Sequence, residues 1–169
     1  MLDQILKLGN PKLYERSAEV RPDEVSHFQG EIDLMHRLIL EYRKVYGQGR
    51  AIAAPQIGLM KRIICVNTDN RYILYNPELT DLSEEMFEVW DDCMSFPGLL
   101  VKVRRHHSCL LRFRDENWAE QTWKLENDMS ELIQHEYDHL DGILATQRAV
   151  DDRSFMLRTS NSGNYPMRV

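Results

Sequence analysis

The sequence predicts an α+β protein, with mostly antiparallel β-sheets around a central helix that carries an H-E-x-x-H string and with an amphipathic helix near the N-terminus. Helical periodicity occurs in two separate segments, and six β-rich runs separated by turn residues lie between them. One helix, several strands and then a second helix is an order typical of α+β folds rather than of alternating α/β folds.

The first helix is predicted over residues 23–46. Apolar residues recur there in alternating steps of three and four, from Val25 to Tyr42, which is the pattern of one face of an amphipathic helix. Pro22 and Asp23 are typical of a helix start, and Gly47 is typical of a helix end.

The β-rich runs follow this helix. Asp69-Asn70 and Asp115-Glu116-Asn117 are predicted to form hairpin turns, because these residue types favour turns. The predicted strands cover residues 62–68, 72–77, 86–90, 99–103, 108–115 and 120–125.

The second helix is predicted to begin at Asp128. Its side chain is expected to cap the helix while Glu131, three residues later, reaches back to the cap. Apolar residues between positions 129 and 140 give this helix a buried face, and Gly142 is expected to end it.

A single catalytic domain is predicted over residues 1–169, a length sufficient to bury a hydrophobic core. The pattern fades after Gln147, so about residues 149–169 are expected to form a weakly patterned C-terminal tail. The segment 159–169 in particular looks weakly ordered.

Composition limits the partners and the compartment. The formal net charge of −6 argues against a direct nucleic-acid partner, and the basic cluster at 102–107 is interpreted as mostly the solvent side of a strand. No apolar run is long enough to span a membrane, and the N-terminus is too short and too charged for a signal peptide. Three cysteines without C-x-x-C spacing favour a reducing, cytoplasmic environment.

The H-E-x-x-H string places two histidines one helical turn apart. His135 and His139 would share a helix face and could both reach one metal ion. Glu136 would lie near that ion but about 100° further around the helix, a position suited to a general base. The alternative is a pair of capped or solvent-facing structural histidines.

A hydrolytic metal site usually has three protein ligands and one open position. The candidates for the third ligand are Cys93, the distant pair His106-His107 and several carboxylates. Cys93 lies at the end of a predicted strand, which could deliver a thiolate onto the helix. A metal in such a site lowers the pKa of its water and polarises a carbonyl. The alternative for Cys93 is a buried thiol.

A third segment, residues 47–58, combines glycines and small side chains with Gln56. Small residues allow close approach of a backbone, and the Gln56 amide could donate to a developing oxyanion. A packed turn with an ordinary glutamine is the alternative.

Together these three segments resemble the peptide deformylase family, and the resemblance covers roughly residues 4–148. The family's A-A-x-Q motif corresponds to 53–56, its E-G-C-L-S motif to 91–95, and its Q-H-E-x-D-H-L-x-G motif to 134–142 without a mismatch. The segment 103–115 resembles the family's V-x-R…D hairpin, with Arg105 at the arginine position.

The resemblance implies removal of the formyl group from N-formyl-methionyl peptides emerging from the ribosome. One divalent metal, iron(II) in most of the family, would be held by Cys93, His135 and His139. Zinc, nickel or cobalt would also suit such a ligand set. Glu136 would transfer the proton, while the Gln56 amide and the backbone N–H of Met94 would hold the formyl oxygen. We expect a monomer or a weak homo-oligomer without direct contact to nucleic acid or membrane.

The departures from the family motifs fall in segments that flank the bound peptide in the family. Arg50 stands where an apolar residue is usual, Ala51 replaces a glycine, and Asp91 and Asp92 replace glutamate and glycine. The family's alanine-arginine pair before the histidine motif is missing, with Glu131-Leu132 nearby. The candidate substrate-binding residues are Gly49, Arg50, Ala51, Ile52, Asp92 and Arg105.

Two hypotheses describe Arg50 and Asp92: they pair across the mouth of the cleft, or both point into water. Two alternatives to nascent-peptide deformylation also stay open. One is the same chemistry on a different formylated or acylated amine. The other is a metal-binding protein of the same fold without useful turnover.

Overall fold

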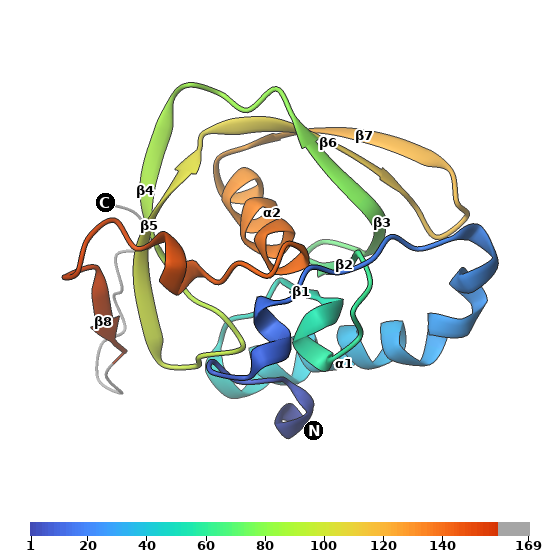
Figure 1. Cartoon of the computed structure of the whole chain (residues 1–169), viewed down its shortest axis with the longest axis horizontal. Coiled ribbons are helices and arrows are strands. Elements are labelled where there is room, and N and C mark those ends of the chain that lie inside the picture. The colour runs from blue at the N-terminus through green and yellow to red at the C-terminus, as the bar shows by residue number, and fades with distance from the viewer. Residues whose placement is uncertain (159–169) are drawn as a thin grey trace.

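The computed structural model describes residues 1–158 of the 169-residue chain. Two antiparallel sheets surround a central helix, α2, while α1 runs beneath the larger sheet in the view of Figure 1. The predicted α+β fold is confirmed. The segment 159–169, predicted as a weakly ordered tail, lies outside the described residues.

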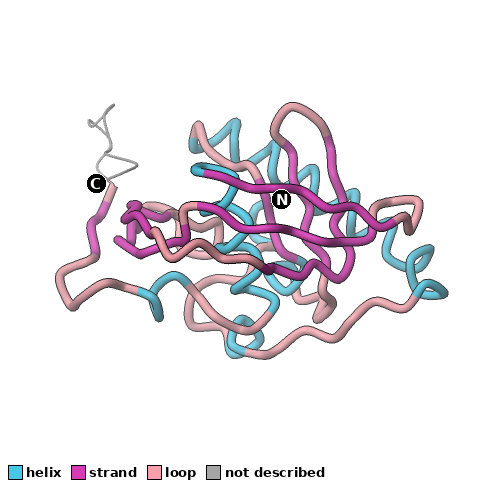
Figure 2. Tube along the Cα trace, turned by 90° about the horizontal axis from the view of Figure 1, so that it is seen from above, coloured by secondary structure: helices cyan, strands magenta, loops and turns pink. Residues whose placement is uncertain are grey.

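The larger sheet has the strand order β1-β2-β3-β6-β7, and the smaller sheet has the order β4-β5-β8. Figure 2 shows the strands from above. The strands are β1 (Ala51–Ala53), β2 (Ile63–Asn67), β3 (Arg71–Thr80), β4 (Met86–Asp91), β5 (Leu99–His106), β6 (Ser108–Arg114), β7 (Glu120–Glu126) and β8 (Phe155–Leu157). Six of them match the predicted runs, and both predicted hairpin turns are present.

Two strands were missed by the sequence analysis. Strand β1 has only three residues, and it forms because Ala51–Ala53 pair with β2. Strand β8 lies within the predicted tail, where Leu157 pairs with Leu99 of β5. Both are defined by long-range pairing, which a local pattern does not reveal.

Helix α1 (Gln29–Tyr46) starts later than predicted. The preceding residues form a 3-10 helix, η3 (Pro22–Phe28), whose first turn is fixed by a 2.8 Å hydrogen bond from the Arg21 N–H to the Glu24 carboxylate. The predicted end is confirmed, because Gly47 adopts the left-handed conformation with φ 71°. The other 3-10 helices are η1 (Leu2–Gln4), η2 (Pro11–Tyr14), η4 (Ala54–Ile57) and η5 (Ala145–Arg148).

Helix α2 (Asn127–Leu140) begins one residue earlier than predicted, and the predicted capping box is wrong. The residue at the N-cap position is Glu126, whose side chain makes no capping hydrogen bond. The Asn127 N–H donates to the His107 carbonyl instead, and Glu131 pairs with Arg50. A long-range ion pair has therefore replaced the expected local cap.

The end of α2 is fixed against the N-terminal segment. Gly142 has φ 73°, and a Cβ added there would lie 2.5 Å from the Tyr14 carbonyl oxygen, so only glycine fits. The Ser17 N–H also donates to the Leu140 carbonyl at 2.9 Å. These contacts hold the histidine-bearing turn of α2 in place.

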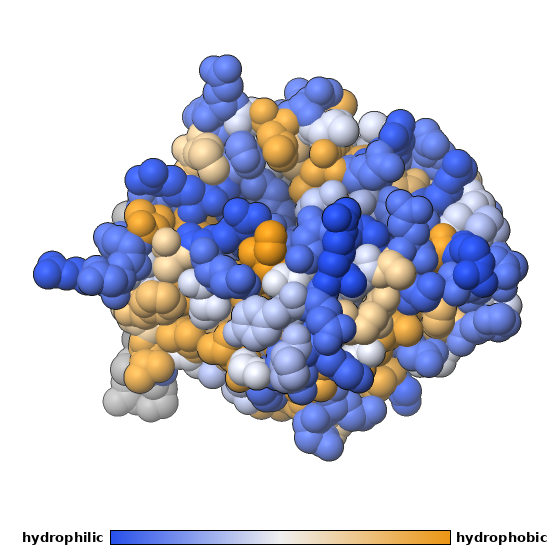
Figure 3. Space-filling model, in the orientation of Figure 1, coloured by the Kyte–Doolittle hydropathy of each residue, from blue (hydrophilic) through white to orange (hydrophobic). Residues whose placement is uncertain are grey.

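Two large core clusters lie on opposite faces of the larger sheet, because alternate residues of β1, β2 and β3 belong to each. The buried face of α1 packs against β2 and η4, while α2 packs against β1 and β6. The visible surface in Figure 3 is mostly hydrophilic, with apolar side chains interspersed. None of the described helices is long and apolar enough to cross a membrane.

Candidate metal centre

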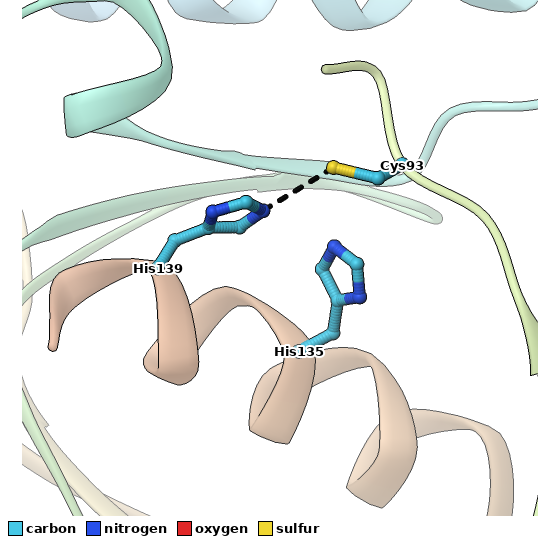
Figure 4. A group of neighbouring side chains, drawn as sticks. All are labelled: Cys93, His135 and His139. Atoms are coloured by element: carbon cyan, nitrogen blue, oxygen red, sulfur yellow. Dashed lines mark hydrogen bonds between the residues drawn. The ribbon is translucent and has the colours of Figure 1, made fainter. Parts of the chain in front are cut away.

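Cys93, His135 and His139 lie together in the interior, and one ligand atom from each lies within 4.8 Å of the other two. The two histidines project from one face of α2, and Cys93 approaches from the segment after β4, as Figure 4 shows. Cys93 Sγ lies 3.3 Å from His139 Nε2. The sequence-predicted ligands are therefore brought together, whereas His106 and His107 lie at the far end of β5.

Asp91 orients His135. The His135 Nδ1 lies 2.8 Å from Asp91 Oδ2, which leaves the other ring nitrogen for the cluster. Burial lowers the pKa of His135, but the Asp91 carboxylate and the Cys93 sulfur more than offset this and hold the pKa above its usual value. The sequence analysis noted Asp91 only as a departure from a motif; its place two residues before Cys93 was the available signal.

His139 is held in the state that a ligand requires. Burial lowers the pKa of His139 well below its usual value, and the neighbouring His135 lowers it further. A metal binds the neutral form of an imidazole, so His139 is ready to bind it, whereas His135 would release its proton as a metal binds. A buried thiol beside two imidazoles is a donor set suited to a divalent transition metal.

Arg105 lies behind His135 rather than in the cleft where a substrate-binding residue was expected. Its guanidinium donates to Asp91 at 2.9 Å and to Asp138 at 2.6 Å, and its side chain is 3% exposed. Asp138 also accepts two hydrogen bonds from Arg148. The observed position makes Arg105 a support for the Asp91–His135 pair, which the sequence did not indicate.

Glu136 is buried next to the cluster. Its Oε2 atom has no hydrogen-bond partner among the described residues. Burial raises the pKa of Glu136 to about 7, although the neighbouring His135 acts in the opposite direction. A carboxyl group with a pKa near neutrality can both take up and release a proton at cellular pH.

Gln56 comes to the cluster from η4. Its Oε1 accepts a 2.9 Å hydrogen bond from the Ala53 N–H, which turns the amide Nε2 toward Cys93 Sγ at 3.5 Å and Ser95 Oγ at 3.2 Å. No described residue accepts a hydrogen bond from the Met94 N–H. The Gln56 amide is therefore next to the sulfur of the candidate centre, and the Ser95 N–H also donates to this sulfur, at 3.4 Å.

A small cavity of about 40 Å³ lies at this centre, and it is lined by Cys93, His135, Glu136, Gln56 and Met94 among others. This space is on the scale of one or two water molecules. Two of the three candidate ligands, the candidate proton-transfer group and the two candidate oxyanion donors thus line one space.

The predicted pairing of Arg50 with Asp92 is wrong. Arg50 pairs instead with Glu131, at 2.8 Å, because Glu131 lies one helical turn before His135 and faces β1. Arg50 and Asp92 both line the pocket next to the centre and are partly exposed, so the other hypothesis, that both side chains point into water, stays a prediction.

The remaining candidate substrate-binding residues differ in position. Ala51 lines the cavity, whereas Ile52 is fully buried in the core. Gly49 has φ 126°, and a Cβ there would lie 3.2 Å from both the Ile39 carbonyl oxygen and the Met94 side chain. Gly49 therefore fixes the path of the chain into β1.

A Cys/His/His cluster that could hold a metal, with a buried carboxylate beside it, is typical of one class of protein, the metal-dependent hydrolases. Within that class, the chain belongs to the peptide deformylase family: the family model described as "Polypeptide deformylase" matches residues 2–154. The known function of this family is deformylation of nascent peptides, and its members are metal-dependent.

Relatives and solved structures agree with this assignment. The chain is 32% identical over 164 residues to a peptide deformylase of Leptospira biflexa, with 90% of each chain covered. A peptide deformylase 1 of Prochlorococcus marinus is 35% identical, with 90% of this chain and 83% of that protein covered. A probable peptide deformylase from Synechococcus phage S-SSM7 superimposes with a TM-score of 0.76 at 30% identity, covering 85% of this chain and 97% of that one.

Two further solved structures come from a class I type b peptide deformylase of Acinetobacter baumannii. The actinonin-bound form has a TM-score of 0.77 at 30% identity, covering 86% of this chain and 96% of that one. The form bound to Met-Ala-Ser has a TM-score of 0.77 at 28% identity, covering 85% and 96% respectively.

Proposed function

We propose that this chain removes the formyl group from N-formyl-methionyl peptides through a metal held by Cys93, His135 and His139. The observation that supports the proposal most strongly is the convergence of these three side chains beside a cavity that Cys93, His135 and Glu136 line. The Acinetobacter relative bound to Met-Ala-Ser, a peptide with an N-terminal methionine, supports methionyl peptides as the product class.

A divalent ion held there supplies a Lewis acid that activates water and polarises the formyl carbonyl. Glu136 takes a proton from the attacking water, a role supported by its burial and by its unpartnered Oε2. The Gln56 amide and the Met94 N–H donate to the formyl oxygen as negative charge develops on it. Glu136 then passes the proton to the leaving nitrogen as the C–N bond breaks, giving formate and a free amine.

For the metal we propose iron(II), with zinc, nickel and cobalt as ions that the same ligands would accept. The thiolate and two imidazoles suit all four ions, so the ligand set favours a soft or borderline divalent metal over magnesium or calcium. For the setting we propose the cytoplasm, with nascent chains leaving the ribosome as the substrates and a monomer or weak homo-oligomer as the active form.

For the site's remaining residues we propose that Gly49, Ala51 and Arg50 shape the entrance to the cavity. Ile52 and Arg105 are proposed to act indirectly: Ile52 anchors β1 in the core, and Arg105 holds the Asp91 carboxylate that orients His135.

Formate release from a formyl-methionyl peptide, measured with protein prepared without oxygen, tests the activity. Each of Cys93→Ala, His135→Ala and His139→Ala is expected to lose the metal from its 1:1 complex and, with it, the activity. Cys109→Ala is the matched control, because Cys109 is buried but lies outside the cluster. Full metal retention in Cys93→Ala would show that the ligand assignment is wrong.

A further inference from the structure

Three consecutive residues of the N-terminal segment, Leu6, Lys7 and Leu8, contact residues that surround the candidate metal centre. The Leu6 N–H donates to the Gln56 carbonyl at 2.8 Å. The Leu8 N–H donates to the Ser95 carbonyl, also at 2.8 Å. Figure 1 shows this segment, in blue, running beside η4. The two backbone hydrogen bonds fix the chain on either side of Lys7, so this residue is held next to the centre.

The Lys7 side chain bonds to the peptide group that follows the cysteine ligand. Its Nζ atom donates to the Met94 carbonyl at 3.3 Å. The same peptide group carries the Ser95 N–H, which donates to Cys93 Sγ at 3.4 Å. Hydrogen bonds in a chain polarise one another, so a cation on this carbonyl strengthens the N–H as a donor to the sulfur.

The positive charge of Lys7 also acts on the sulfur directly. Partial burial lowers the pKa of Lys7, while the charges of Cys93 and Asp3 act in the opposite direction. The ammonium is therefore within electrostatic range of the sulfur. Asp3 itself pairs with the N-terminal amine of Met1 at 2.8 Å, and no carboxylate among the described residues forms a salt bridge with Lys7. The charge of Lys7 is thus not neutralised by a direct ion pair.

Two groups donate to the Cys93 sulfur, the Ser95 N–H and, at 3.5 Å, the Gln56 amide. Under the proposed function the Gln56 amide donates to the formyl oxygen, so the Ser95 N–H is the donor that serves the sulfur throughout the reaction. Hydrogen bonds and positive charge beside a metal-bound thiolate reduce the electron density that it gives to the metal. This favours the lower oxidation state of a redox-active metal.

We propose that Lys7 is a positioning residue for the metal centre: through the Met94–Ser95 peptide group it directs positive charge at the Cys93 sulfur and favours iron(II) over iron(III). The inference rests on the proposed function, in which iron(II) is the metal. It adds a residue outside the three sequence motifs, in contact with neither the metal ligands nor the cavity, that keeps the ion divalent.

The first test measures the reduction potential of iron-loaded protein by controlled-potential titration, in which the electrode takes up the one electron that each iron(II) releases. Lys7→Met removes the charge but keeps an unbranched stem. At a fixed potential this variant is expected to contain about threefold to tenfold more iron(III) relative to iron(II) than the parent, since one charge near the protein surface, partly screened by water, has an effect of this size.

Two further variants show whether the charge of Lys7 is the cause. Lys7→Arg retains the charge and should keep the potential of the parent. Lys44→Met is the matched control, because Lys44 is exposed near the end of α1 and lies outside the cavity, and it should also leave the potential unchanged. An unchanged potential in Lys7→Met would overturn the proposal, and so would equal shifts in Lys7→Met and Lys7→Arg.

Cobalt(II)-loaded protein provides a second readout, at the sulfur itself. Light that moves an electron from the Cys93 sulfur to cobalt(II) is absorbed at lower energy when the sulfur is richer in electrons. This absorption band is therefore expected at longer wavelength in Lys7→Met than in the parent, Lys7→Arg and Lys44→Met. An unchanged band in Lys7→Met would overturn the route through the sulfur.

Neither readout requires turnover, so the inference and the proposed function can fail separately. Shifts in Lys7→Met without formate release by the parent would support the inference and contradict the function. Formate release by the parent without a shift in Lys7→Met would support the function and overturn the inference.

Discussion

The two sides of α2 differ in whether a buried carboxylate of the helix has partners for both of its oxygens. On the side that faces β5, the Gln134 side chain bonds to the backbone of His106 and Asp138 is held by two arginines. On the side that faces the cavity, Glu136 Oε2 has no partner among the described residues. The matched side fixes the helix, and the unmatched side leaves a reactive group available to a substrate.

Because of this difference, we expect substitutions on the two sides of α2 to change different properties of the protein. Substitutions on the cavity side should change catalysis with little change in the free energy of unfolding. Substitutions on the matched side should change the free energy of unfolding first, and catalysis only through the position of the ligands.

The largest catalytic effect is expected for Glu136→Gln. This variant should keep its metal but lower kcat by about 10²- to 10⁴-fold, because a neutral amide cannot take up the proton. Steady-state kinetics together with metal analysis would measure both properties. Glu116→Gln, in the exposed turn between β6 and β7, is the control and should behave like the parent protein. Near-normal turnover in Glu136→Gln would remove Glu136 from the mechanism.

On the matched side, Arg105→Met should lower the free energy of unfolding by about 3–5 kcal/mol, because it leaves Asp91 and Asp138 buried with fewer cationic partners. Urea denaturation followed by circular dichroism would measure the change. Arg104→Met is the matched control: its side chain is 61% exposed and pairs with Glu88, so less than about 1 kcal/mol is expected.

Arg105→Met should also weaken metal binding by roughly 10- to 100-fold, since the Asp91 carboxylate that orients His135 loses its support. Titration with a metal ion would detect this. Equal stability of the Arg104 and Arg105 variants would contradict a structural role for the buried network.

A smaller catalytic effect is expected for Gln56→Leu. Loss of the amide donor should cost about 2.7–4 kcal/mol of transition-state stabilisation, which would appear mainly in kcat. Gln48→Leu, outside the cavity, is the control. If Gln56→Leu changed KM alone, Gln56 would be a ground-state binding residue instead.

The sequence predicted a feature correctly where residues close together in the chain determine that feature. The periodicity of α1, the six main strands and the i, i+4 spacing of His135 and His139 are all local, and all appear in the structure. The pairing of Arg50 with Glu131 and the burial of Arg105 depend on residues far apart in the chain. No local pattern distinguishes a buried arginine from one in a cleft, so the sequence indicated neither of these two contacts.

At neutral pH, the smallest change in the free energy of unfolding is expected for substitution of His36, an unmatched polar residue far from the metal centre. His36 is buried on α1, and neither ring nitrogen has a hydrogen-bond partner among the described residues. Burial lowers the pKa of His36 to about 4, and the charge of Arg71 acts in the same direction. On the cavity side, the unpartnered Glu136 oxygen is available for reaction. His36 has no such role, so it shows how an unpartnered buried group affects the free energy of unfolding alone.

His36→Leu should therefore change the free energy of unfolding at pH 7.5 by less than about 1 kcal/mol, in either direction, because an apolar side chain of similar size replaces an unmatched polar one. Its clearer effect should be on pH dependence. The unfolded chain takes up a proton at His36 near its ordinary pKa of 6.5, while the folded chain resists protonation until the pH approaches about 4. The parent protein thus loses stability as the pH falls through this window.

Without His36 this contribution disappears, so the stability of His36→Leu should fall less steeply between pH 6.5 and pH 4. Urea denaturation at several pH values would measure both slopes. His27→Leu is the matched control, since His27 is exposed in η3, and its slope should equal that of the parent. Identical slopes for the parent and His36→Leu would mean that folding does not lower the pKa of His36. The assignment of a neutral His36 in the folded protein would then be wrong.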